Sequence, residues 1–299
     1  MKVGVMLPQA AEDGDGGTWR GIVALARRAE AGGLDSVWLS DHFFYHADDG
    51  SETGYHEPWS LLAALAGCTD RIELGTLVLA TSFRPPGLLA RMAATTDDIA
   101  AGRLILGLGC GWHEPEYRAF GYPFDHRVGR FEESLQVIVP LLRGERVTYA
   151  GRWSSVDDAA ILPPPRRRVP ILIAAKGERM LRLTARYADA WETAWFGLPD
   201  ERFASLRDRL LEACRLEGRD ATTLEQTVGI EVVGPDDPIG SVGPRTLPLD
   251  AGALADGLAT WAEAGVGHVQ LSFAWATART YDVVIEAVRR FRGAGMVGG

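Results

Sequence analysis

The chain reads Leu-Ile-Leu-Gly-Leu-Gly-Cys-Gly-Trp-His-Glu-Pro-Glu-Tyr over residues 104–117. The apolar residues at 104–108 are typical of a buried strand, and glycines at 107, 109 and 111 lead into large polar and aromatic side chains. Glycine lets the backbone approach a ligand closely, and parallel α/β proteins bind ligands at the carboxyl ends of their strands. The stretch therefore predicts a strand that ends in a binding loop.

Strand-like and helix-like segments alternate along the chain on both sides of this stretch. Apolar runs predict strands over residues 3–7, 36–40, 71–78, 104–108, 170–174, 189–193, 226–232 and 267–272. Amphipathic patterns predict helices over residues 18–31, 57–68, 86–101, 126–142, 177–187, 200–217, 250–264 and 279–292. Strict alternation predicts a parallel sheet, and eight units favour a closed (β/α)₈ TIM barrel over a doubly wound sheet, which typically has six strands. We expect one α/β domain, residues 1–299, with small insertions.

Two segments interrupt the alternation for longer than an ordinary loop. Residues 143–169 predict a small β excursion that ends in a proline-rich return. Residues 233–249 are rich in glycine and proline and predict a mobile loop after the seventh strand. Loops of this length in a compact domain are usually functional or disordered.

Composition excludes several classes of protein. The net charge of −9 argues against a nucleic-acid partner, and the 299 residues contain no apolar run long enough to span a membrane. The first residues enter a strand without a signal-peptide pattern, so we expect a cytoplasmic protein. The three cysteines have no metal or redox spacing, which indicates reduced thiols. Histidines 42 and 46 lack a third ligand, so we expect no metal site.

Polar residues follow the second predicted strand. Asp41 and His42 could form a pair in which the carboxylate orients the imidazole for acid–base work or for a cofactor contact. Equally, Asp41 could cap a turn while His42 packs against its neighbours. The pair alone leaves both interpretations open.

The fifth predicted strand runs directly into a helix through Ala-Lys-Gly-Glu-Arg, residues 175–179. Small residues at such a junction expose backbone N–H groups at the positive end of the helix dipole, which suits a phosphate. Lys176 and Arg179 could add charge there, or they could be solvated surface residues. The glycines at 107–111 match neither the dinucleotide fingerprint nor a P-loop.

Taken in order, these motifs resemble the bacterial luciferase-like flavin and deazaflavin oxidoreductases, and most of all the branch that uses coenzyme F420. They are Ser-Asp-His-Phe at 40–43, Gly-Thr-Leu-Val at 75–78, Gly-Arg-Leu-Ile-Leu-Gly-Leu-Gly-Cys-Gly-Trp at 102–112, Arg-Phe-Glu-Glu at 130–133 and Ala-Arg-Tyr-Ala-Asp-Ala-Trp at 185–191. The resemblance covers roughly residues 1–195. It implies hydride transfer between coenzyme F420 and a small organic substrate, in a homodimer. An FMN-dependent monooxygenase that uses O₂ is the alternative, and a catalytically silent barrel is a third possibility.

The resemblance also implies the site. The implied catalytic residues are His42, beside the reactive carbon, and Asp41. The implied cofactor residues are His42, Thr76, Leu77, Val78, Gly109, Cys110, Gly111, Trp112, Ala175, Lys176, Gly177 and Glu178. The implied substrate residues are Phe44, His56, Trp112 and Trp195. In the family a non-proline cis peptide supports the ring, and by position it would be Leu77–Val78.

Trp112 marks a departure from part of that family. The deazaflavin-dependent sugar-phosphate dehydrogenases carry a glutamate at this position, and that glutamate is their proposed acid. The resemblance therefore argues against glucose 6-phosphate as a substrate. With Phe44, His56 and Trp195, Trp112 indicates an aromatic and less charged substrate pocket.

Overall fold

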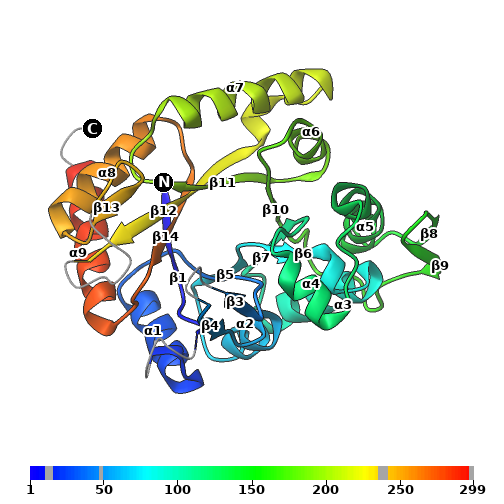
Figure 1. Ribbon diagram of the computed structural model, residues 1–299, viewed down its shortest axis with the longest axis horizontal. Helices are drawn as coiled ribbons and strands as arrows, with labels where there is room; N and C mark the ends of the chain where they lie inside the picture. The colour runs from blue at the N-terminus through cyan, green and yellow to red at the C-terminus, as the bar shows by residue number, and fades with distance from the viewer. Residues whose placement is uncertain (11–15, 47–49, 235–241, 296–299) are drawn as a thin grey trace.

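Eight parallel strands form a closed barrel (Figure 1). The computed structural model describes residues 1–299 except 11–15, 47–49, 235–241 and 296–299. The barrel strands are β1 (Lys2–Met6), β2 (Ser36–Leu39), β5 (Glu73–Thr76), β7 (Leu104–Gly109), β10 (Ile171–Ala174), β11 (Ala190–Phe196), β12 (Glu225–Val233) and β14 (His268–Phe273). Each strand pairs with the next in this order, and β14 pairs with β1, so the sheet has no open edge. The predicted (β/α)₈ barrel is confirmed.

Helices surround the barrel, and their bounds agree closely with those that the sequence predicts (Figure 1). They are α1 (Trp19–Ala31), α2 (Pro58–Ala66), α3 (Pro86–Ile99), α5 (Arg127–Leu142), α6 (Glu178–Tyr187), α7 (Glu201–Leu216), α8 (Ala251–Glu263) and α9 (Ala278–Gly295). Side chains at Thr18, Asp200 and Asp250 accept hydrogen bonds from backbone N–H groups of the first turns of α1, α7 and α8. Such caps satisfy donors that have no partner inside the helix, and this fixes where each helix begins.

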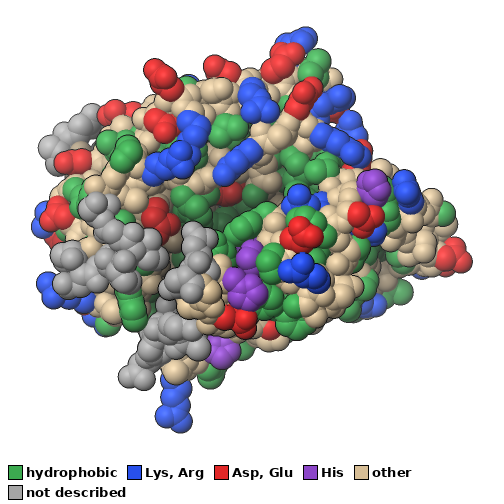
Figure 2. Space-filling view, in the orientation of Figure 1, with side chains coloured by type: hydrophobic (Ala, Val, Ile, Leu, Met, Phe, Trp, Pro, Cys, Tyr) green, Lys and Arg blue, Asp and Glu red, His purple; other side chains and the backbone are tan. Residues whose placement is uncertain are grey.

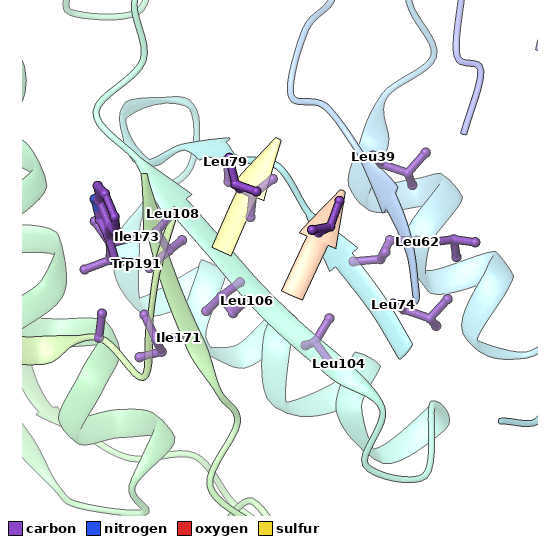
Figure 3. Close-up of a cluster of buried hydrophobic side chains, with 14 of the residues drawn as sticks. Leu39, Leu62, Leu74, Leu79, Leu104, Leu106, Leu108, Ile171, Ile173 and Trp191 are labelled. Carbon is purple, nitrogen blue, oxygen red and sulfur yellow. The ribbon is translucent and has the colours of Figure 1, made fainter. Parts of the chain in front are cut away.

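The core has an outer and an inner layer. Successive side chains of a strand point to opposite faces, so each barrel strand contributes to both layers. Leu104, Leu106 and Leu108 of β7 belong to the large outer layer between strands and helices (Figure 3). Trp38, Ile105, Leu172 and Ala190 form the inner layer inside the barrel. Because both faces are buried, the strands read as nearly continuous apolar runs.

Several short elements lie outside the eight strands and eight helices of the barrel. They are the hairpin β3 (Phe44–His46) and β4 (Glu52–Gly54), β6 (Leu79–Ala80), α4 (Glu114–Phe120), and the hairpin β8 (Val147–Ala150) and β9 (Ser155–Ala159). The last hairpin confirms the β excursion predicted within residues 143–169. Among the described residues, no helix has the length and apolar character needed to cross a membrane.

The loop predicted over residues 233–249 is only partly described. Residues 235–241 lie outside the described part of the chain. Thr246–Pro248 forms strand β13, which pairs with Glu231–Val233 at the end of β12. The segment that the sequence predicts as a mobile loop therefore contains a short strand that the sequence does not predict. Backbone groups at the projecting end of β12 are available for pairing, and a local sequence rich in glycine and proline does not reveal such a distant partner.

Candidate active site

A pocket of about 430 Å³ opens at the carboxyl ends of the barrel strands. Figure 2 shows a hollow in the face of the molecule seen in Figure 1, with apolar side chains inside it and charged side chains around it. The lining residues are Asp41, His42, Leu77, Val78, Ala80, Phe83, Gly109, Cys110, Gly111, Trp112, His113, Glu116, Tyr117, Ala174, Ala175, Lys176, Gly177, Met180, Glu192, Ala194 and Trp195. Strand ends and the loops after them supply most of this lining, as in other barrels of this class.

Most of the site residues that the sequence predicts meet in this pocket. Those that line it are Asp41, His42, Leu77, Val78, Gly109, Cys110, Gly111, Trp112, Ala175, Lys176, Gly177 and Trp195. Four others lie outside the lining: Thr76, Phe44, His56 and Glu178. Thr76 is buried and its hydroxyl bonds the backbone of Gly107, Phe44 begins β3, His56 precedes α2, and Glu178 is the first residue of α6.

The Leu77–Val78 peptide is cis, which confirms the expectation for this bond. Val78 packs against the glycines of β7. A Cβ added to Gly109 would lie 2.7 Å from Val78 Cγ2, so only glycine lets the Leu77–Val78 segment approach β7 this closely. A second non-proline cis peptide, Ala194–Trp195 at the end of β11, was not predicted, and both of its residues line the pocket.

Asp41 does not pair with His42, so the proposed Asp–His pair is wrong. The Asp41 carboxylate receives two hydrogen bonds from the Arg84 guanidinium, at 2.8 and 3.0 Å, and one from the Ala80 N–H. Burial acts to lower the pKa of Arg84, but Asp41 and Glu57 outweigh it and raise that pKa above its ordinary value. Consecutive side chains after a strand diverge, which sends Asp41 toward the segment after β6 while His42 faces the pocket.

Glu116 of α4 is the partner of His42. Its carboxylate lies 3.0 Å from His42 Nδ1 and accepts hydrogen bonds from the N–H groups of Phe43 and Phe44. Burial alone would raise the pKa of Glu116, but the hydrogen bonds from His42 and Phe43 lower it below its ordinary value. An ionised carboxylate only accepts hydrogen bonds, so Nδ1 of His42 carries a proton and donates it to Glu116.

The sequence places Glu116 next to the predicted binding loop, but none of its motifs identifies this residue as the partner of His42. The residue lies in the polar run after the glycine-rich loop, 74 residues from His42. Helix α4 places it under the β2 loop with its side chain only 1% exposed. The partnership depends on how two loops of neighbouring strands meet, which no local pattern encodes.

Glu192 is a further pocket residue without a motif. It lies on β11 with 4% of its surface exposed, and Oε1 of its carboxyl has no hydrogen-bond partner among the described residues. Burial raises the pKa of Glu192 to about 7, although the charge of Lys176 and the backbone N–H of Gly229 oppose this shift. A glutamate in an apolar strand pattern is easily taken for a surface residue.

Helix α6 points its amino terminus at the pocket. Its N-cap residue Gly177 has no side chain to cap the helix, so the first N–H groups remain available at the positive end of the dipole. Lys176 donates to the Ala194 carbonyl at 2.5 Å, and Arg179 pairs with Glu132. The phosphate cradle at this junction stays a prediction.

Aromatic rings form the outer wall. Trp112 is 59% exposed, and its ring lies edge-on to His42 with 5.7 Å between the ring centroids. His113 and Tyr45 stack beside it, and Trp195 is exposed across the pocket mouth. Burial lowers the pKa of His113, which favours its neutral form.

Residues 1–238 match the protein family described as luciferase-like monooxygenase. The chain belongs to this family. Among curated relatives, it is 35% identical over 207 residues to the F420-dependent glucose-6-phosphate dehydrogenase of Microbacterium testaceum, covering 68% of this chain and 61% of the relative. It is 30% identical over 237 residues to the F420-dependent hydroxymycolic acid dehydrogenase of Mycobacterium tuberculosis, covering 78% of this chain and 64% of the relative. The matched region thus spans about three fifths of the length of these relatives.

Solved structures of luciferase-like proteins share the architecture. An F420-dependent secondary alcohol dehydrogenase, in complex with an F420-acetone adduct, superposes with a TM-score of 0.79 over 97% of this chain and 99% of that one. The two sequences are 20% identical. At that identity the likeness establishes the barrel and not the chemistry.

Proposed function

We propose that this luciferase-like protein is an oxidoreductase that transfers a hydride between coenzyme F420 and a small carbonyl or alcohol substrate, as a homodimer. The observation that carries the proposal is the convergence of three features in one pocket. These are the cis Leu77–Val78 segment that lines the pocket, the His42 ring held by Glu116, and the amino terminus of α6, which has no side-chain cap. The names of the two curated relatives support F420 as the cofactor.

The residues present fit such a cofactor. Leu77 and Val78 offer an apolar surface for one face of a planar ring, and Gly109 leaves the space beside it open. The free N–H groups at Gly177 and the residues after it suit a phosphate. The unpartnered Oε1 of Glu192 lies in the same pocket lining, where a bound polar molecule would satisfy it.

When bound, F420 supplies or accepts the hydride, and the protein orients the reactants and excludes water. Glu116 fixes the His42 ring by holding its Nδ1–H, so Nε2 of His42 is the atom left to contact the reacting centre. The buried Asp41–Arg84 pair holds the β2 loop against the segment after β6. The wall at Leu77 and Val78 keeps water away from the ring face.

The charges of the lining favour an uncharged substrate. Within the described part of the chain, Lys176 is the only Lys or Arg that lines the pocket, and its ammonium already binds the Ala194 carbonyl. A sugar phosphate requires several cationic or bidentate donors in addition to those that hold the cofactor phosphate. The aromatic wall around Trp112 instead suits an aromatic or apolar aldehyde, ketone or alcohol.

Fluorescence titration tests the cofactor directly. We expect purified protein to bind F420 in the micromolar range and to reoxidise bound reduced F420 with members of a panel of aromatic aldehydes and ketones, but not to reduce F420 with glucose 6-phosphate. Binding of FMN without binding of F420 would reverse the assignment. Binding of F420 without turnover of any panel member would reject the carbonyl class.

A further inference from the structure

We propose that Glu192 is the acid–base residue of this pocket, which gives a proton to the substrate oxygen during carbonyl reduction and takes it back during alcohol oxidation. The inference rests on the proposed function and adds to it the source of the proton. Three observations carry it: the burial of Glu192, its unpartnered carboxyl oxygen and the engagement of the other pocket acids.

Glu192 is buried against the barrel on all sides except the pocket. It sits on an inward-facing position of β11, and its register partner on β12 is Thr227. Only 4% of its surface is exposed, yet it belongs to the pocket lining. A molecule in the pocket can therefore reach this carboxyl. The missing partner of Oε1 marks a polar contact that the described residues leave unmade.

The other titratable side chains that line the pocket are less suited to give a proton to the substrate, because each has a hydrogen-bond partner or a shifted pKa that opposes this role. They are Asp41, His42, Cys110, His113, Glu116, Tyr117 and Lys176. Asp41 is paired with Arg84, and Glu116 is ionised by three hydrogen bonds. Tyr117 donates its hydroxyl to the Cys110 carbonyl, and burial raises the pKa of both Tyr117 and Cys110.

The basic members of the lining are equally constrained. His42 donates its Nδ1–H to Glu116 and keeps only Nε2 for the reacting centre, where it orients the substrate, and burial makes His113 a weaker base. Lys176 donates to the Ala194 carbonyl. On the neighbouring strand β14, His268 is buried and hydrogen-bonded to Ser36, and burial lowers its pKa to about 3, which keeps it neutral. Among the described lining residues, Glu192 alone combines a carboxyl oxygen that has no hydrogen-bond partner with a pKa near neutrality.

The step balances without another reactant. In carbonyl reduction the C=O π bond breaks, the carbon gains the hydride with its electron pair, and the oxygen gains the proton of Glu192. The carbonyl becomes an alcohol, the reduced deazaflavin is oxidised by two electrons, and Glu192 becomes a carboxylate. In alcohol oxidation the carboxylate takes the hydroxyl proton as the hydride leaves.

Infrared difference spectroscopy of the F420-loaded protein tests the protonation state without any substrate. We expect a buried carboxylic-acid band that disappears between pH 6 and pH 8, because burial raises the pKa of Glu192 to about 7. Glu192→Gln should lack the band. Thr227→Val should keep it, because this control changes the paired barrel position, whose hydroxyl has no hydrogen-bond partner among the described residues.

Kinetics with the fastest aldehyde of the panel test the role. Wild-type aldehyde reduction should fall tenfold per pH unit above pH 7, since the acid must be protonated. Glu192→Gln should lower turnover about 100-fold and abolish this pH dependence. Glu192→Asp should restore the pH dependence at a reduced rate, and Thr227→Val should behave as wild type.

The outcomes separate the two proposals. A protein that binds and turns over F420 while Glu192→Gln keeps the wild-type rate and pH profile would overturn the role of Glu192 and leave the proposed function standing. The absence of the carboxylic-acid band at pH 6 would do the same. A protein that binds no F420 would overturn the proposed function itself.

Discussion

At the residue scale, the two neighbours Asp41 and His42 serve different parts of the protein. Asp41 stabilises the backbone through Arg84 and Ala80, whereas His42 faces the pocket and is oriented by Glu116. The sequence identified both residues but left open whether they pair with each other. Their true partners follow other strands, so the pairing is a consequence of the barrel and not of the motif.

His42 can be tested by truncation. His42→Ala should lower turnover about 100-fold, because the substrate loses the imidazole that orients it at the reacting centre, while the Kd for F420 changes little. Glu116→Gln should give a smaller loss because the imidazole remains but its Nδ1–H loses the anionic acceptor. Steady-state kinetics and fluorescence titration measure both quantities.

His126→Ala is the matched control, because its imidazole is exposed and does not line the pocket. It should leave turnover unchanged. Wild-type turnover in His42→Ala would reject a catalytic role for that residue.

The raised pKa of Glu192 also predicts how stability varies with pH. Its pKa in the folded state is about 7, against an ordinary value of 4.5, so the folded state holds this proton more tightly than the unfolded state. The stabilisation is complete below pH 4.5, falls as the pH rises from 4.5 to 7 and is gone at pH 8, a total loss of about 3 kcal/mol. Glu192→Gln removes this dependence.

Urea unfolding at pH 5 and pH 8 measures the effect. The free energy of unfolding of Glu192→Gln, relative to wild type, should increase by about 2.5 kcal/mol between the two pH values, because the loss in wild type has already begun at pH 5. Thr227→Val removes no charge and should show no such change. An equal difference at both pH values would mean that Glu192 titrates normally.

At the element scale, the glycine-rich loop between β7 and α4 owes its shape to Gly111. This residue has φ +71°, and a Cβ there would lie 1.7 Å from the hydroxyl of Tyr117, which is buried and donates to the Cys110 carbonyl. The loop therefore needs glycine for two reasons, a left-handed backbone and the absence of a side chain.

Gly111→Ala and Gly121→Ala separate these two reasons. Gly121 has φ +73° but no atom near an added Cβ, so its replacement should cost about 1 kcal/mol for the backbone alone. Gly111→Ala should cost about 2 kcal/mol more through overpacking and should weaken F420 binding at least tenfold. Urea unfolding and fluorescence titration give both values, and equal behaviour of the two variants would contradict the steric argument.

At the scale of the whole molecule, the barrel closes around Trp38. Its ring is fully buried in the inner layer and lies where a side chain at Gly75 would be, with 2.2 Å from the ring to an added Cβ. Its indole N–H donates to Ser36 Oγ, which also bonds His268. One side chain thus joins β2 to β5 and β14 across the interior.

Trp38→Ala should destabilise the protein by about 3–5 kcal/mol, because the cavity lies at the centre of a closed barrel that cannot collapse around it. Trp19→Ala is the control, since this ring is 39% exposed at the start of α1 and its loss should cost less than about 1 kcal/mol. Urea unfolding followed by circular dichroism compares the two. Similar costs would show that the interior repacks.

The sequence by itself determined the order of the elements and the end of the barrel that carries the site. Periodicity and helix caps act within a few residues, so the eight strands and the helices between them could be predicted, and with them the residues at the strand ends. Gly109 and Gly111 likewise predicted the binding loop, and the family resemblance predicted that the Leu77–Val78 peptide is cis.

Only the tertiary structure decided which side chains work together. It paired His42 with Glu116, tied Asp41 to Arg84, placed Glu192 in the pocket and gave β13 a partner on β12. Each of these arrangements depends on how separate strands and loops meet in three dimensions. Their energies depend on burial and on the closed geometry of the barrel, and neither exists until all eight strands have met.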